Sequence, residues 1–180
     1  LRREIVSLKP VGRRQHPLRV LVLGGSQGAE ALNERIPEVI RRLENIHGAG
    51  AVTVLHQAGR AHRAATQARY ADVSGVEVRD FVDDMVNAYR RTDLAICRSG
   101  AITVAELAVV GIASILIPYP YAVDDHQTSN ARHLSDYGAA FLVPQHEADI
   151  QTLAGLVERF IAEPDLSHTM GQAARARSVP

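Results

Sequence analysis

Residues 18–29 read LRVLVLGGSQGA, an apolar run that passes directly into a glycine-rich turn. Residues 18–24 are apolar nearly throughout, which is typical of a strand covered on both faces in a parallel sheet. In residues 29–43 apolar side chains recur every three or four positions, which predicts an amphipathic helix. Pro37 lies inside this segment and is expected to kink or divide it. Strand, turn and helix together indicate the first unit of an α/β fold.

The same alternation continues along the rest of the chain. Five further β-rich runs predict strands at residues 52–56, 76–81, 94–98, 114–118 and 140–143. Helical segments are predicted at residues 83–89, 101–110, 126–137, 149–162 and 165–176. Parallel neighbours need crossover connections, and helices between strands supply them. We therefore predict the α/β class, with a Rossmann-like, doubly wound parallel sheet of about six strands.

The composition fits one globular domain with an uneven charge distribution. Of the 180 residues, 46% are hydrophobic and 22% are charged, which excludes wholesale disorder. Lys plus Arg equal Asp plus Glu at 20 each, whereas a dedicated nucleic-acid binder usually carries a basic excess. Residues 1–70 nevertheless hold 12 basic and 5 acidic side chains, and residues 71–180 hold 8 and 15.

Residues 1–17 are strongly basic, and we interpret them as a linker that leads into the domain at residues 18–180. One interpretation of this lead-in is a solvated, poorly ordered segment. The other is that one or two of its arginines reach a phosphate or face an anionic surface.

Cysteine and hydrophobic patterns predict a soluble chain. Cys97 is the only cysteine, which fits a reducing compartment, and its place in an apolar strand predicts an inert core thiol. The first twenty residues lack the apolar segment of a signal peptide. The longest uncharged run, residues 107–123, contains glycine and prolines and falls short of the ~20 apolar residues that a membrane-spanning helix needs.

The turn GGSQG at residues 24–28 is the first candidate binding site. In open α/β sheets ligands bind beyond the carboxyl ends of the strands. Glycines let the backbone approach a ligand, and the following helix N-terminus offers N–H groups to an anion. Ser26 adds a hydroxyl, which could equally serve as a helix cap.

Two familiar phosphate-binding classes are disfavoured. The chain contains no GxxxxGK[ST] motif, so it is not a P-loop NTPase. The turn departs from GxGxxG, and the second strand ends in His56 and Gln57 with no acidic residue for a dinucleotide ribose. A nicotinamide-dependent dehydrogenase is therefore disfavoured.

Residues 97–107, CRSGAITVAEL, repeat the arrangement of strand, turn and helix. This helix N-terminus is expected at the same sheet edge as the first, and two such ends could hold a diphosphate between them. Glu106 could accept two hydrogen bonds from a ribose diol. Helix capping is the competing interpretation, because Thr103 and Glu106 fit a capping box and Ser99 could also cap. The spacing alone favours capping.

Residues 119–130, YPYAVDDHQTSN, form a polar loop that enters the next helix. Gln127 and Asn130 are three residues apart, so they share a helix face and could both hydrogen-bond a sugar. Asp124, Asp125 and His126 are adjacent, which favours capping by an aspartate over a metal site. No D-x-D triplet is present. The remaining histidines lack ligand spacing and are expected at the surface: His16, His47, His56, His62, His133, His146 and His168.

Five motifs, in their order and spacing, resemble the MurG family of glycosyltransferases. They are GGSQGA at 24–29, HQAG at 56–59, DFVDDM at 80–85, CRSGAITVAEL at 97–107 and DDHQTSNA at 124–131. The family adds N-acetylglucosamine to the lipid-linked muramyl-pentapeptide precursor of peptidoglycan. Its two Rossmann-like domains face each other across a cleft, the GT-B architecture. This chain resembles only the C-terminal domain, which binds UDP-N-acetylglucosamine (UDP-GlcNAc).

The resemblance implies a set of donor-binding residues. Arg2 matches an arginine near the donor diphosphate, and Val82 stands where a backbone group holds the uracil. Thr103 is implied near phosphate and Glu106 on the ribose diol. The implied contacts are Arg2, Ser26, Val82, Ala101, Ile102, Thr103, Val104, Ala105, Glu106 and Gln127, with Gly25, Phe81, His126 and Asn130 as further candidates. His126 stands where some relatives have a glutamine.

The resemblance also implies an inverting, metal-independent transfer in which UDP-GlcNAc is a substrate and no cofactor is expected. The family places the general base, the lipid acceptor site and the membrane-binding surface in the N-terminal domain. We therefore expect a fragment that binds donor but is inactive alone. In the whole protein, the implied location is peripheral, at the cytoplasmic face of the bacterial membrane, with no nucleic-acid partner.

Two alternatives remain open. One is a naturally separate donor-binding subunit of a split GlcNAc transferase. The other is a non-catalytic nucleotide-sugar-binding module. A sugar-nucleotide epimerase with a Tyr-x-x-x-Lys pair is disfavoured, because the sole lysine is Lys9.

Overall fold

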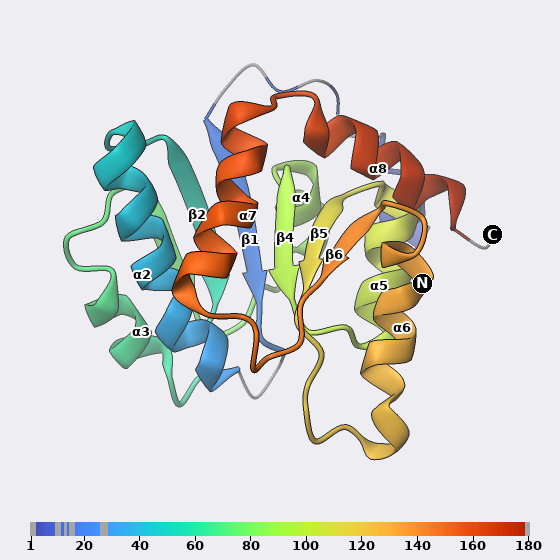
Figure 1. The fold of residues 1–180 in the computed structure, drawn as a ribbon, viewed down its shortest axis with the longest axis horizontal. Coiled ribbons are helices and arrows are strands. Elements are labelled where there is room, and N and C mark those ends of the chain that lie inside the picture. Colours follow the sequence, from blue (N-terminus) through green and yellow to red (C-terminus); the bar gives the residue numbers. More distant parts are fainter. Residues whose placement is uncertain (1–2, 10–11, 13, 15–16, 26–28, 179–180) are drawn as a thin grey trace.

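A six-stranded parallel sheet forms the centre of the computed structural model, which describes residues 3–9, 12, 14, 17–25 and 29–178 (Figure 1). The strands are β1 (Leu18–Leu23), β2 (Val52–Gln57), β3 (Val76–Arg79), β4 (Leu94–Cys97), β5 (Ala113–Leu116) and β6 (Ala140–Leu142). Their order is β3-β2-β1-β4-β5-β6, and every neighbouring pair is parallel. The predicted fold class and all six predicted strands are confirmed.

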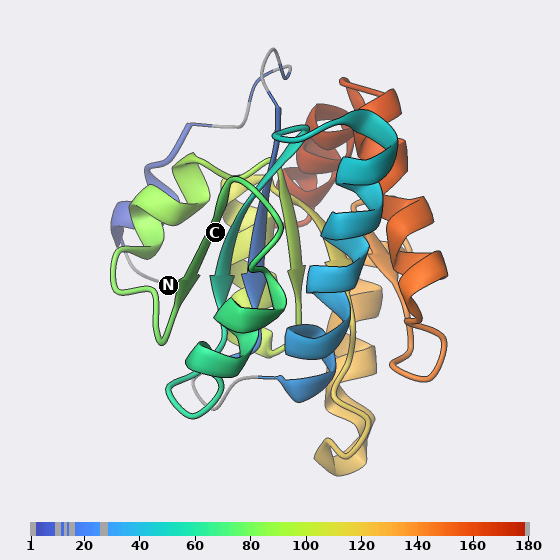
Figure 2. The ribbon, with the colours of Figure 1, turned by 90° about the vertical axis from the view of Figure 1, so that its left-hand side faces the viewer.

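Helices cover both faces of the sheet. They are α1 (Arg3–Val6), α2 (Glu30–His47), α3 (Arg63–Arg69), α4 (Met85–Arg90), α5 (Ala101–Val110), the 3₁₀ helix η1 (Val123–Asp125), α6 (His126–Ser135), α7 (Ile150–Ala162) and α8 (Leu166–Ala176). Figure 2 shows α2 and α7 on one side of the sheet and α1 and α4 on the other. The buried apolar side chains form two cores. The first includes residues of α2 and α7, and the second includes residues of α5 and α6. Helix α8 contributes Met170 to the first core and Ala174 to the second.

The helix α2 is continuous through Pro37, so the expectation that this proline divides it is wrong. Proline removes one backbone hydrogen bond from a helix interior. Tertiary packing usually supplies most of a helix's stability, and α2 buries its apolar face on both sides of Pro37: Leu32, Ile36, Val39, Ile40 and Leu43. The short helix α3 was not predicted, since only Thr66 among its residues is buried and no apolar period marks it.

The described part of the lead-in packs against the domain. Ile5 and Leu8 are buried in the core that α5 also lines. Arg175 of α8 donates to the carbonyl of Leu8 at 3.3 Å. From residue 14, the Arg14 guanidinium donates to the carbonyl of Phe160 at 2.8 Å, near the end of α7. The interpretation of this segment as a solvated lead-in is therefore wrong for these residues, because their apolar side chains are buried.

Cys97 behaves as the sequence predicts. Its side chain is fully buried at the end of β4. Burial raises the pKa of the thiol to about 12, which keeps it protonated and unreactive at neutral pH. Within the described ranges, none of the helices has the length and apolar character needed to cross a membrane.

Candidate functional site

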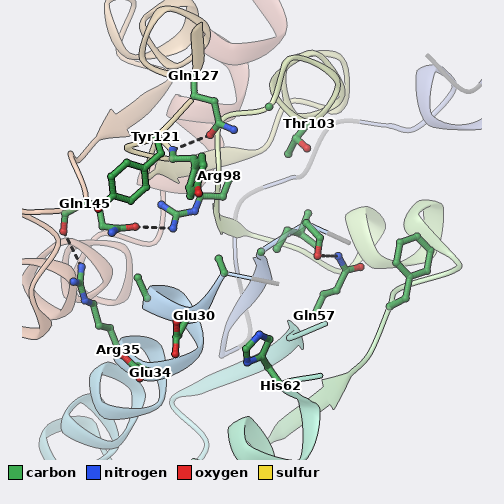
Figure 3. A pocket seen from close by; sticks show the side chains of 18 of the residues that line it. Glu30, Glu34, Arg35, Gln57, His62, Arg98, Thr103, Tyr121, Gln127 and Gln145 are labelled. Carbon is green, nitrogen blue, oxygen red and sulfur yellow. Dashed lines mark hydrogen bonds between the residues drawn. The ribbon is translucent and has the colours of Figure 1, made fainter. Parts of the chain in front are cut away.

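A cleft of about 980 Å³ lies at the carboxyl ends of the strands, where the strand order reverses between β1 and β4 (Figure 3). Strands β1 and β4 are paired with Leu23 beside Cys97. The turns that follow them lead into α2 and α5, so both helix N-termini lie at this edge, as predicted. Such a topological switch point is the usual ligand site in open α/β sheets.

The start of α5 is free of side-chain caps. Gly100 occupies the N-cap position and makes no side-chain cap bond, while Thr103 is the third helical residue and Glu106 the sixth. Ser99 instead donates its hydroxyl to the carbonyl of Gln127 at 2.8 Å. Both capping interpretations of this segment are therefore wrong. The first-turn N–H groups of α5 can serve an anion, since helix N-termini attract negative charge.

Glu106 lies in the wall of the cleft and is only 8% exposed. One carboxylate oxygen, Oε2, accepts a hydrogen bond from the hydroxyl of Tyr89 at 2.8 Å. A carboxylate offers about four lone-pair sites, so this bond fixes the group without saturating it. The arrangement is suited to accepting hydrogen bonds from a pair of neighbouring hydroxyl groups.

The segment after β3 forms another wall of the cleft. Phe81 lines it and is half exposed. The side chain of Val82 is buried, and its backbone N–H donates to Oε1 of Gln57 at 2.9 Å. Val82 itself lies outside the cleft lining, and because its N–H is engaged by Gln57, the backbone group that it can still offer a ligand is its carbonyl. Gly25, at a φ of +86°, completes this side, and its carbonyl accepts from Nε2 of Gln57 at 3.1 Å.

Gln127 joins two loops at the opposite side of the cleft. Its Oε1 accepts from the backbone N–H of Tyr119 at 2.9 Å and from that of Ser99 at 3.3 Å. The side-chain NH₂ of Gln127 is the part that can donate to a ligand.

Comparison with known proteins agrees with this geometry. A family model described as "Glycosyltransferase family 28 C-terminal domain" matches residues 19–179. The chain belongs to this family. The motif-based resemblance is thereby confirmed.

Curated relatives carry the same assignment. A Shewanella amazonensis protein is 47% identical over 184 residues, covering 99% of this chain and 50% of the relative. One from Chromohalobacter salexigens is 50% identical over 167 residues, covering 92% and 44%. Both are named UDP-N-acetylglucosamine--N-acetylmuramyl-(pentapeptide) pyrophosphoryl-undecaprenol N-acetylglucosamine transferase. The chain therefore spans about half the length of these relatives.

A solved structure gives the same result. The crystal structure of Acinetobacter baumannii MurG is 39% identical and superposes with a TM-score of 0.86, covering 98% of this chain and 51% of that one. The doubly wound sheet thus corresponds to one half of a GT-B protein.

The structure brings part of the implied donor set of the family to the cleft. Gly25, Phe81, Thr103, Glu106 and Gln127 line it. Arg2 and Ser26 lie outside the described residues.

Other implied residues lie away from the cleft lining. Ala101 and Ile102 are exposed, and Val104 is buried in the core with its N–H bonded to the carbonyl of Gly100 at 3.0 Å. Ala105 is half-buried and lies, like them, outside the lining. None of these four residues lines the cleft.

Two further candidates, both in α6, have side chains that point elsewhere. Asn130 donates to the carbonyl of Ser99 at 3.0 Å, and Nδ1 of His126 lies 2.6 Å from the carbonyl of Val123. Neither side chain lines the cleft. Asp125 occupies the N-cap position of α6 but makes no cap bond, since it accepts from the Thr128 hydroxyl at 2.6 Å.

An arginine cluster in the cleft was missed by sequence reasoning. Arg98 donates to Oε1 of Gln145 at 2.6 Å and lies 5.5 Å from the ring of Tyr119. Arg35 donates to the carbonyl of Gln145 at 2.8 Å. Figure 3 shows these side chains across the cleft from Gln57. Burial lowers the pKa of Arg98. Arginine is not deprotonated in proteins, so both side chains place positive charge at this wall of the cleft.

The sequence signal for Arg98 is its place in the CRSG motif, at the end of a predicted strand. Tyr119 and Tyr121 in the following loop also line the cleft.

His56 corrects the expectation that the scattered histidines are surface residues. It is fully buried, with Nδ1 2.9 Å from the Tyr70 hydroxyl and Nε2 2.9 Å from Oδ1 of Asn33. Burial lowers its pKa to about 4, so the ring is neutral at pH 7. Among the residues that the structure describes, no three His, Cys, Asp or Glu side chains gather as a metal site.

Proposed function

We propose that this chain binds UDP-GlcNAc and is the donor half of an inverting N-acetylglucosaminyltransferase in peptidoglycan synthesis. The observation that carries the proposal is the cleft at the switch point, which combines two helix N-termini with the tethered carboxylate of Glu106. Membership in glycosyltransferase family 28 and the names of the relatives support this choice of ligand.

The diphosphate of the donor is proposed to lie between the N-termini of α2 and α5. Their N–H groups favour an anion. Arg2, Ser26 and Thr103 are retained as proposed phosphate contacts from the family resemblance. Positive potential here stabilises the charge that grows on the leaving diphosphate, so it acts most strongly in the transition state.

The nucleoside is proposed to lie against the wall formed after β3. The carbonyl of Val82 can accept from the N3–H of uracil, and Phe81 can pack against the ring. Glu106 then accepts from both ribose hydroxyls, held in place by Tyr89. On the other side, the Gln127 amide is positioned to donate to the sugar.

The transfer is proposed to proceed without a metal ion. The acceptor hydroxyl attacks the anomeric carbon as the bond from that carbon to the diphosphate oxygen breaks, and UDP departs with the electron pair. The general base, the lipid-linked acceptor site and the membrane contact are assigned to the other half of the protein, at the cytoplasmic face of the membrane.

Calorimetric titration of the chain with UDP-GlcNAc, UDP and ADP tests the proposal. We expect uridine nucleotides to bind and ADP to bind at least tenfold more weakly, since a base site that pairs with a donor N–H rejects an analogue lacking it. Glu106→Ala is expected to weaken UDP-GlcNAc binding by roughly tenfold or more, through lost hydrogen bonds to a charged group.

Glu77→Ala is the matched control, because Glu77 is an exposed glutamate on β3 outside the cleft. Its affinity for UDP-GlcNAc is expected to equal that of the wild type. Equal binding of uridine and adenosine nucleotides would refute the proposal.

A further inference from the structure

Gln57 joins two backbone segments that lie on either side of its own strand. It is the last residue of β2 and is only 4% exposed. Its Nε2 donates to the carbonyl of Gly25 at 3.1 Å, in the turn after β1. Its Oε1 accepts from the N–H of Val82 at 2.9 Å, in the segment after β3. One amide thus spans the two loops.

The backbone at Gln57 is fixed independently of this bridge. The N–H of Ala58 donates to the carbonyl of Arg79 at 2.9 Å, and that of Gly59 donates to Asp80 at 3.1 Å. On the opposite face of β2, His56 is held between Tyr70 and Asn33. The Gln57 side chain therefore starts from a fixed point, and its loss removes the bridge while the strand ladder remains.

We propose that Gln57 is a positioning residue for the donor, setting the distance between the diphosphate turn at Gly25 and the base-binding backbone at Val82. This inference rests on the proposed function, which assigns the two loops to different parts of one ligand. When two subsites hold one molecule, its affinity exceeds that of either part of the molecule alone. This gain in affinity depends on how the subsites are placed relative to each other, and a displacement of about 1 Å can remove much of it. Gln57 itself need not touch the donor.

The amide is chemically suited to this role. It provides one donor and one acceptor within a single planar group, whereas an ionised carboxylate only accepts. A carboxylate at this position would place a negatively charged oxygen against the carbonyl oxygen of Gly25, which is also an acceptor, so the two would repel. A protonated carboxyl group would restore one donor and one acceptor in nearly the same shape. Gln57→Glu therefore makes the bridge dependent on pH, and burial raises the pKa of such a carboxyl group.

The experiment compares affinities for UDP-GlcNAc and uridine, each by calorimetry at about pH 5 and about pH 8, in the wild type, Gln57→Glu and Gln57→Leu. The measured quantity is the ratio of the two affinities. We expect Gln57→Leu to lower this ratio roughly tenfold at both pH values. Gln57→Glu is expected to stay within about twofold of the wild type at the lower pH and to fall roughly tenfold at the higher pH.

Two controls separate this role from a merely structural one. Tyr70→Phe removes a buried hydrogen bond on the other face of β2 and is expected to keep the wild-type ratio. The wild type and the variants share the other titratable side chains of the cleft, among them His62, Glu30, Glu34, Arg35, Arg98 and Glu106. The wild type at each pH is therefore the reference.

The outcomes are distinct. If the wild type does not bind UDP-GlcNAc, the proposed function fails and this inference falls with it. If the wild type binds but Gln57→Leu keeps the ratio, or loses both ligands equally, the positioning role alone is overturned. Should Gln57→Leu not fold, Gln57→Glu decides, and a ratio that does not recover at the lower pH overturns the inference.

Discussion

The two edges of the sheet hold buried carboxylates in different ways. At the amino end of β4, the fully buried Asp93 accepts from the backbone N–H, Nε and Nη2 of Arg19 at 2.8, 3.1 and 3.0 Å. At the carboxyl end, Glu106 is almost as buried but is held by the neutral hydroxyl of Tyr89 and faces the cleft. The carboxylate paired with a cation stabilises the fold, whereas the one held by a hydroxyl beside a cavity still has acceptor sites for a ligand.

The largest expected effect concerns the amino edge. Arg19→Ala removes the cation from a carboxylate that water cannot reach, and we expect it to lower the free energy of unfolding by about 3–5 kcal/mol. Urea denaturation measures this change. Arg79→Ala, which breaks the exposed pair with Glu77, is expected to cost less than about 1 kcal/mol. Equal losses in the two variants would show that burial of the pair is unimportant.

His56 is a third buried ionisable group, and it differs from Asp93 and Glu106 because it is enclosed in the core between two neutral partners, Asn33 and Tyr70. Its pKa is about 4 in the folded chain and about 6.5 when unfolded, so the unfolded state binds the proton first as pH falls. The free energy of unfolding should therefore be constant above about pH 6.5 and decline towards about pH 4, by about 3 kcal/mol from this residue. Denaturation curves of the wild type and His56→Gln across this range measure the difference. The same decline in both proteins would assign it to other groups.

Gly171→Ala tests the close contact between α8 and the end of α5. A Cβ at Gly171 in α8 would lie 2.3 Å from the carbonyl oxygen of Gly111, the residue that ends α5. We expect a loss of about 1–3 kcal/mol in stability from this overpacking, with unchanged affinity for UDP-GlcNAc. Gly155→Ala in α7 meets no atom within 4 Å and is expected to stabilise by about 0.5–1 kcal/mol. Thermal unfolding of both variants checks the contrast, and a stable Gly171→Ala would contradict it.

The smallest expected effect lies in the cleft itself. Tyr89→Phe removes the hydroxyl that positions Glu106, and we expect UDP-GlcNAc affinity to fall about fivefold, since a hydrogen bond contributes about 1 kcal/mol. Titration calorimetry gives the value. Tyr137→Phe, at an exposed tyrosine outside the cleft, is the control. A loss as large as that of Glu106→Ala would mean that the tyrosine does more than position the carboxylate.

Local pattern was sufficient for most of the fold. Apolar runs and helical periods predicted every strand and the longer helices, because they depend on neighbours within a few residues. The parallel order then placed two helix N-termini at one edge, and Gly25, Phe81, Thr103, Glu106 and Gln127 at the cleft. Helix α3 escaped prediction because it carries almost no apolar face.

The direction of individual side chains around the cleft was not predictable. Gln127 and Asn130 share a helix face by their spacing, but spacing does not say what that face meets. In the structure Gln127 lines the cleft, whereas Asn130 bonds to the carbonyl of Ser99. Likewise, the start of α5 at Ala101 was predicted, but the spacing did not show that Gly100 is the N-cap residue and that the Ser99 hydroxyl bonds to the carbonyl of Gln127 instead of capping the helix.

The sequence by itself determined the parallel α/β class, the family motifs and the place of the glycine turn. Only the tertiary structure decided that Asp93 is neutralised by Arg19, that Glu106 is held by Tyr89 and that Gln57 spans two loops. The physical reason is distance along the chain. Gln57 finds its partners 32 residues earlier and 25 residues later. Such bonds form only once three parallel strands have aligned, and no local propensity encodes them.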